Sequence, residues 1–211
     1  MSNLTSIILS APAILFGLTI HEYAHALIAL KLGDPTAKFM GRLTLNPLKH
    51  LDPIGTISLF LFRLGWAKPV PINPNYFRNY KQGVLLTSLA GPGANFISAI
   101  AFGLFLRIIY SFSSLSPNSF IIVILEMFVF YNLILAIFNL IPIPPLDGSK
   151  ILYYLLPSTM AEEYAKLERY GFFILIGIII FGQLTGFSIF GIIILPIIRI
   201  FSTAIIGYSI L

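Results

Sequence analysis

Long runs of apolar residues alternate with short polar stretches along this chain, and they predict about five membrane-spanning helices. Most of the runs approach or exceed the roughly 20 apolar residues that a helix needs to cross a bilayer. Helices are favoured because the runs are too long for barrel strands and because a helix satisfies its own backbone in lipid. The predicted spans are about 4–30, 84–109, 120–141, 170–185 and 189–208.

The segment between the first two spans has a different pattern. Residues 36–83 are interrupted by five prolines, yet they are too apolar for an ordinary soluble loop. Two stretches within it, Arg42 to Leu45 and Thr56 to Phe62, alternate with turns as short β-strands do. We therefore predict an all-α polytopic membrane protein with a membrane-associated β-hairpin-like element at about 36–62.

Composition agrees with a membrane protein. Of the 211 residues, 57% are hydrophobic and 10% are charged, and the mean hydropathy is +0.93. A soluble domain carries roughly 25% charged residues. The net charge of +5 is weak evidence for nucleic acid, because eight of the 13 Lys and Arg lie in 31–83, where retention of basic loops in the cytoplasm explains them. We expect a lipid bilayer and no nucleic acid as partner.

The same charge bias predicts the orientation of the chain. Residues 31–83 carry eight basic and two acidic side chains, whereas 110–119 carry none. Basic loops stay inside, so 31–83 and 149–169 are predicted to be cytoplasmic, as is the end of the last span. The N-terminus and 110–119 are predicted to be outside. Because no basic n-region precedes the first apolar run, we expect a span there rather than a cleaved signal peptide, in a multi-pass protein of the cell membrane.

The first span contains the sequence His21-Glu22-Tyr23-Ala24-His25, which is H-E-x-x-H. Residues i and i+4 share one helix face, so both imidazoles can reach one metal ion, while the glutamate can take a proton from a water. The chain has no cysteine, which excludes thiolate ligands. Chance, or a polar face packed inside a bundle, explains the motif less well than metal binding does, because such a cluster is costly in lipid.

A catalytic zinc site keeps three protein ligands and one open position, and Asp147 is the best third candidate. The predicted topology places it at the cytoplasmic end of the third span, at the depth of His21 and His25. The proline-rich break before it lets a loop aim its carboxylate inward. An isolated Asp-Gly pair is more often a simple turn, so the interpretation depends on the histidines at the same depth. The other acids lie in loops, near the outer end of a span or in solvated segments: Asp34, Asp52, Glu126, Glu162, Glu163 and Glu168.

Several other polar or small residues leave two interpretations open. Asn95 and Asn139 are amides in apolar helices, and each either bonds a neighbouring helix or donates to a substrate carbonyl or developing oxyanion. His50 lies outside the spans, where a histidine most often has no special role. The Gly91 and Gly93 pair is assigned to close helix packing.

Together these motifs resemble the site-2 proteases, the intramembrane zinc metalloproteases of peptidase family M50, which cut other proteins within or near their transmembrane segments. Besides H-E-x-x-H, the similar stretches are Gly41–Pro47, His50–Thr56, Gly65–Pro71, Ala90–Asn95 and Asn139–Gly148. No PDZ or CBS domain is visible in the sequence, and in this respect the chain resembles the compact members of the family.

The resemblance implies one Zn²⁺ per chain, held by His21, His25 and Asp147, with Glu22 as the general base. It also implies that Asn95 and Asn139 are active-site residues. It further implies a catalytic core of the first three spans, with the 36–83 element packed into the membrane near the site.

We therefore predict a single membrane-embedded metalloprotease domain over 1–211. It hydrolyses transmembrane proteins or peptides in regulated intramembrane proteolysis, with its active site toward the cytoplasm. One alternative is a membrane metal transporter or sensor, but Gln183 and Arg199 are the only strongly polar side chains well inside the last two spans. A second alternative is a protein that binds transmembrane segments without cutting them, and the intact set of predicted site residues argues against it. The oligomeric state is left open.

Overall fold

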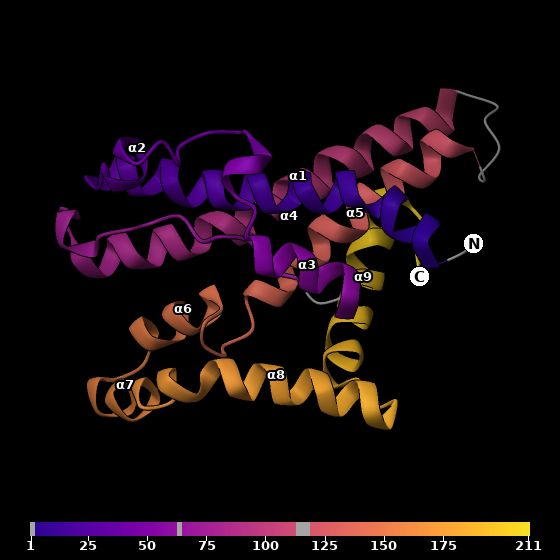
Figure 1. Cartoon of the computed structure of the whole chain (residues 1–211). Helices are drawn as coiled ribbons and strands as arrows, with labels where there is room; N and C mark the ends of the chain where they lie inside the picture. The colour runs from indigo at the N-terminus through magenta and orange to yellow at the C-terminus, as the bar shows by residue number, and fades with distance from the viewer. Residues whose placement is uncertain (1–2, 63–64, 113–118) are drawn as a thin grey trace.

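The structure is a computed structural model that describes residues 3–62, 65–112 and 119–211 (Figure 1). Within these residues, five helices are long and apolar enough to cross a membrane. They are α1 (Asn3–Leu32), α4 (Tyr80–Phe112), α5 (Phe120–Asn139), α8 (Glu168–Thr185) and α9 (Ile189–Ile206). The predicted helical fold with about five such segments is confirmed, with ends that differ by a few residues. Most of the predicted loop 110–119 lies outside the described residues.

Shorter helices connect these five. Between α1 and α4 lie α2 (Thr36–Phe39), a 3₁₀ turn at Pro47–Lys49, α3 (Pro53–Phe62) and a second 3₁₀ turn at Pro74–Tyr76. Between α5 and α8 lie α6 (Asp147–Leu155) and α7 (Ser158–Ala165). The polar stretch after the third span is therefore largely helical.

The β-hairpin predicted at about 36–62 is not found in the described residues, where the only strand-like pairing is an isolated antiparallel bridge between Leu51 and Ala67. Thr56 to Phe62 lies in α3 instead. A short apolar run fits a helix as well as a strand, and the deciding signal stands just before it. The Asp52 side chain accepts the Gly55 N–H at 2.7 Å, and Pro53 is the first helical residue; both features favour a helix start.

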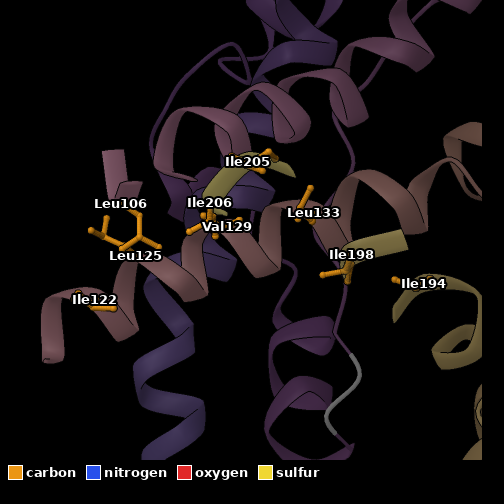
Figure 2. Close-up of a cluster of buried hydrophobic side chains, with 10 residues drawn as sticks. Leu106, Ile122, Leu125, Val129, Leu133, Ile194, Ile198, Ile205 and Ile206 are labelled. Carbon is orange, nitrogen blue, oxygen red and sulfur yellow. The ribbon is translucent and has the colours of Figure 1, made fainter. Parts of the chain in front are cut away.

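The apolar core lies among α4, α5 and α9 (Figure 2). On α4, Gly103 lets α9 approach closely, because a Cβ there would lie 2.3 Å from Ile205 Cγ2. The first helix joins this core through Phe16, whose ring lies 5.3 Å from that of Phe102 on α4 and 5.5 Å from that of Phe128 on α5. The buried members of the core are Ala99, Leu106, Ile122, Leu125, Val129, Leu133, Ile194, Ile198, Ile205 and Ile206.

Helix α8 runs apart from the α1–α4–α5 group, with α6 and α7 at its start and α9 at its end (Figure 1). Gly171 anchors its first turn, since a Cβ there would lie 2.3 Å from the Pro144 carbonyl oxygen. Most of its other side chains, such as Phe173 and Leu184, are exposed, as expected of a helix that faces lipid.

The end of α9 corrects one feature of the predicted topology. The Tyr208 hydroxyl donates to Glu126 Oε1 at 2.6 Å and lies 3.2 Å from the Tyr110 hydroxyl. Tyr110 lies in the last turn of α4, where the predicted loop 110–119 begins, so the end of α9 lies on the side of that loop and not on the side of α6 and α7. The bias of basic residues toward the cytoplasm could not fix the orientation of this end, because Arg199 is the only charged residue after Arg169.

Candidate metal centre

His21 and His25 on α1 meet Asp147, the first residue of α6. Their Nε2 atoms are 3.0 Å apart, and Asp147 Oδ2 lies 3.2 Å from His21 Nε2 and 3.0 Å from His25 Nε2. All three side chains are buried. In the part of the chain that the structure describes, this is the one group of three or more His, Cys, Asp or Glu residues placed to hold a metal ion, with ligand atoms within 4.8 Å of one another.

A hydrogen bond to α4 fixes the His21 ring, and α1 and α5 in turn hold the side chain that accepts it. Its Nδ1 donates to Asn95 Oδ1 at 2.7 Å. The amide nitrogen of Asn95 donates to the Gly17 carbonyl at 2.8 Å and to Asn132 Oδ1 at 3.0 Å. The Asn95 oxygen is thereby the acceptor, so the proton of a neutral His21 lies on Nδ1 and its Nε2 carries a lone pair.

His25 is fixed in the same way by a main-chain group. Its Nδ1 lies 2.7 Å from the Thr87 carbonyl oxygen of α4, which only accepts, so in the neutral ring Nε2 is again the unprotonated atom. Both imidazoles therefore point lone pairs toward Asp147 Oδ2.

This convergence tests whether the residues fit a metal ion. Asp147 Oδ2 is buried and has no hydrogen-bond partner. Three buried acceptor atoms separated by 3.0–3.2 Å repel one another unless a cation lies between them. The separations approach the about 3.3 Å expected between ligand atoms around a tetrahedral zinc ion with bonds of about 2.0–2.1 Å. The donor set and the spacing fit Zn²⁺.

The local fold aims the Asp147 carboxylate and keeps it charged. Asp147 lies in the first turn of α6, where the helix dipole favours a negative charge. Gly148 allows the chain to pass the end of α5, since a Cβ there would lie 2.2 Å from the Leu140 carbonyl oxygen. Burial raises the pKa of the Asp147 carboxyl, but His21 and His25 lower it more when their rings are protonated, so that the pKa then lies well below its usual value.

Gly91 lets α4 pass close to the two histidines. A Cβ on Gly91 would lie 2.4 Å from His25 Nε2 and 2.6 Å from His21 Nε2. A Cβ on Gly93 would meet nothing within 4 Å. The two glycines therefore do not share the predicted role in helix packing. Gly91 makes room for the imidazoles, and Gly93 does not.

Glu22, between the two histidines in sequence, stands outside the group of three. Its side chain is buried, and Oε2 accepts the Val70 N–H at 2.8 Å. The carboxylate is therefore oriented by a main-chain donor from the segment before α4. This leaves it available as a proton acceptor.

The structure separates the two predicted asparagines. Asn95 is fully buried behind His21 and bonds its ring. Asn139 is half-buried, and its amide donates to the Leu135 carbonyl at 2.9 Å within α5. Asn132, fully buried beneath Asn95, was missed, although it too is an amide in an apolar span and carries the same signal.

His50 lies away from the centre. It is buried, and its Nε2 lies 2.8 Å from the Thr44 carbonyl oxygen in the loop after α2. Sequence analysis also missed Lys150, whose Nζ lies 3.8 Å from Asp147 Oδ1, and the main-chain groups of Thr87 and Val70. Every residue has an N–H or C=O, so these last two carry no sequence signal.

Comparisons with known proteins find similarity to a peptidase family and to named zinc metalloproteases. The family model "Peptidase family M50" matches residues 105–182. The chain is 42% identical over 160 residues to "Putative zinc metalloprotease YwhC" of Bacillus subtilis (strain 168), an alignment that covers 74% of this chain and 73% of the relative. It is 30% identical over 171 residues to "Putative zinc metalloprotease Rip2" of Mycolicibacterium smegmatis, covering 79% of this chain and 64% of that protein. No solved structure matches the chain significantly.

Proposed function

Since the chain belongs to peptidase family M50, we propose that it is a zinc metalloprotease that hydrolyses peptide bonds within or near the transmembrane segments of other membrane proteins. The observation that carries the proposal is the convergence of three buried lone-pair atoms, two from α1 and one from the first turn of α6, beside a buried glutamate. A polar centre of this kind in apolar helices is costly unless it has a function.

His21, His25 and Asp147 would hold one zinc ion. When bound, zinc lowers the pKa of a water molecule and polarises a substrate carbonyl. Glu22 accepts a proton from the attacking water and then delivers a proton to the leaving amine. Its bond from the Val70 N–H holds one carboxylate oxygen and leaves the other for this exchange.

The two asparagines have different parts in this mechanism. Asn95 keeps the His21 ring in the tautomer that presents Nε2, through the bond at Nδ1, as outer-shell partners of metal ligands do. Asn139 stands at the end of α5, just before the loop that leads to Asp147. We assign it a contact to the substrate carbonyl, for which its amide exchanges its intrahelical partner.

The substrate is an apolar segment that has lost its helical hydrogen bonds. A helix hides its carbonyl groups in i to i−4 bonds, so the scissile peptide has to unwind before attack. A mostly apolar cavity of about 340 Å³ lies along the turns of α1 that precede the motif, which suits an apolar substrate side chain. It is lined by Pro12, Leu15, Phe16, Thr19 and Ile20, with Leu45 and Pro47 opposite.

Several apolar helices and the family make this a multi-pass membrane protein. We place it in the cell membrane with the metal centre toward the cytoplasm, on the side of the basic segment 31–83.

The orientation can be tested with single introduced cysteines, because the chain has no cysteine of its own. With an impermeant thiol reagent on intact cells, Ser158→Cys in α7 should be protected and Leu211→Cys labelled; the opposite pattern would reverse the orientation.

The proposal is tested with purified protein in liposomes and a single-span test substrate whose fragments are located by mass spectrometry. We expect cuts within or close to the span, and no cuts in a soluble protein of similar length. Cuts confined to soluble segments would overturn the intramembrane assignment. Zinc movement into the liposomes without cleavage would favour the transporter alternative, and substrate capture without cleavage would favour the non-cleaving binder.

A further inference from the structure

Residues Trp66–Asn73, here called the strap, contact Glu22 through their main chain. Val70 donates its N–H to Glu22 Oε2 at 2.8 Å across 48 residues of sequence. The Val70 side chain is buried and packs with Ala26 of α1 and Ala37 of α2. The amide therefore cannot turn away from Glu22 without exposing this small apolar cluster.

The sequence of the strap restricts it to one donor at this place. Val70 stands between Pro69 and Pro71, and proline has no N–H and a fixed φ. The Val70 amide is thus the only main-chain donor between Lys68 and Ile72. Because the prolines also restrict the unfolded chain, ordering this segment costs less conformational entropy.

Two buried charged side chains hold the strap on either side of Val70. Arg42 Nη2 donates to the Lys68 carbonyl at 2.7 Å, and the Lys68 N–H donates to the His50 carbonyl at 2.8 Å. Beyond Val70, the Asn73 N–H donates to Asp34 Oδ2 at 2.7 Å. Arg42 is 8% exposed and Asp34 is fully buried. Burying such groups is costly, and here both are used to fix the main chain that bonds Glu22.

We propose that the strap is the positioning element of the general base, and that Arg42 and Asp34 are positioning residues that act through it. The Val70 N–H holds the Glu22 carboxylate in place for proton transfer. A displacement of about 1 Å in such a group is enough to cost about 100-fold in rate. The inference rests on the proposed function, because it concerns the base of that reaction.

The experiment compares Val70→Pro, which removes the N–H, with Val70→Ala, which keeps it and loses only side-chain packing. In the zinc-loaded protein we expect Val70→Pro to lower kcat by about 10- to 100-fold, the range for lost outer-shell partners, with little change in KM or zinc content. Val70→Ala should lose clearly less. Arg42→Met should lower kcat in the same direction, and Arg42→Lys should restore part of it, because lysine retains a donor for the Lys68 carbonyl.

A double variant separates positioning from general stability. If Arg42 acts through the Val70 amide, Val70→Pro with Arg42→Met loses no more kcat than Val70→Pro alone, whereas independent effects on the fold would multiply. Independent losses, or a Val70→Pro protein that cleaves like Val70→Ala, would overturn the inference.

If Val70→Pro fails to retain zinc, the comparison of Arg42→Met with Arg42→Lys decides whether the strap positions Glu22. Arg42→Met with full zinc and wild-type kcat refutes the role of the strap, while a loss of kcat that Arg42→Lys partly restores supports it. A zinc-loaded wild type that cleaves nothing would remove both the proposed function and this inference. A wild type that cleaves, with kcat insensitive to Val70→Pro, would remove only the inference.

Discussion

Gly91 occupies the point where α4 passes the two histidines, so Gly91→Ala perturbs the proposed metal centre with a single methyl group. The added carbon would lie 2.4 Å from His25 Nε2 and 2.6 Å from His21 Nε2. Favourable contact between heavy atoms needs about 3.5 Å, so the imidazoles or α4 have to move by about 1 Å. Metal sites tolerate deviations of only about 0.2 Å in ligand distances. The change should therefore open the centre.

The cost to the fold is smaller than the cost to the metal. Overpacking of this kind costs about 1–3 kcal/mol, and alanine in place of glycine within a helix returns up to about 1 kcal/mol. We therefore expect the Gly91→Ala protein to remain folded. Its zinc affinity should fall by at least about 100-fold, which equals or exceeds the largest losses of metal affinity seen when outer-shell partners are removed. Cleavage should fall with it.

Gly93→Ala is the matched control, because it lies on the same helix and its Cβ would meet nothing within 4 Å. Zinc retention against a competing chelator, thermal unfolding and cleavage of a single-span substrate are measured on both variants. Gly93→Ala should behave as wild type in all three. A Gly91→Ala protein with full zinc and wild-type cleavage would refute the reasoning, as would equal losses in both variants.

Three further results are expected. Asn95→Ala removes the acceptor at His21 Nδ1 and should weaken zinc binding about 10- to 100-fold in chelator competition; unchanged affinity would show that the bond does not support the ligand. Zinc binding needs unprotonated imidazoles and an ionised Asp147 carboxylate, so bound zinc should decrease as the pH is lowered from neutral to acid. Zinc content that stays constant over an acid pH titration would contradict this set of ligands. Gly148→Ala places a Cβ 2.2 Å from the Leu140 carbonyl oxygen, which should destabilise the protein by about 1–3 kcal/mol in thermal unfolding, and an unchanged Tm would contradict that contact.

Sequence patterns were informative wherever the physics depends on side-chain type. Apolar runs mark spans because lipid requires apolar surface, and they predicted the five candidate helices. The i, i+4 spacing placed His21 and His25 on one face, and the depth argument placed Asp147 beside them; the structure brings these three together.

The rest depended on features that sequence does not encode by residue type. The Thr87 carbonyl and the Val70 N–H orient His25 and Glu22, but every residue has such groups. The run in α3 is too short for its period to distinguish helix from strand. The role of Gly91 is visible only once the separation between α1 and α4 is known.

The most direct measurement compares zinc content and cleavage in wild type and Glu22→Gln. Glu22 lies outside the group of three proposed ligands, so the substitution should leave about one zinc ion in each protein. Loss of a general base should lower cleavage by about 100- to 10,000-fold. One zinc ion in both proteins with cleavage by wild type alone is the predicted result. Wild-type cleavage by Glu22→Gln, or no zinc in either protein, would contradict the account.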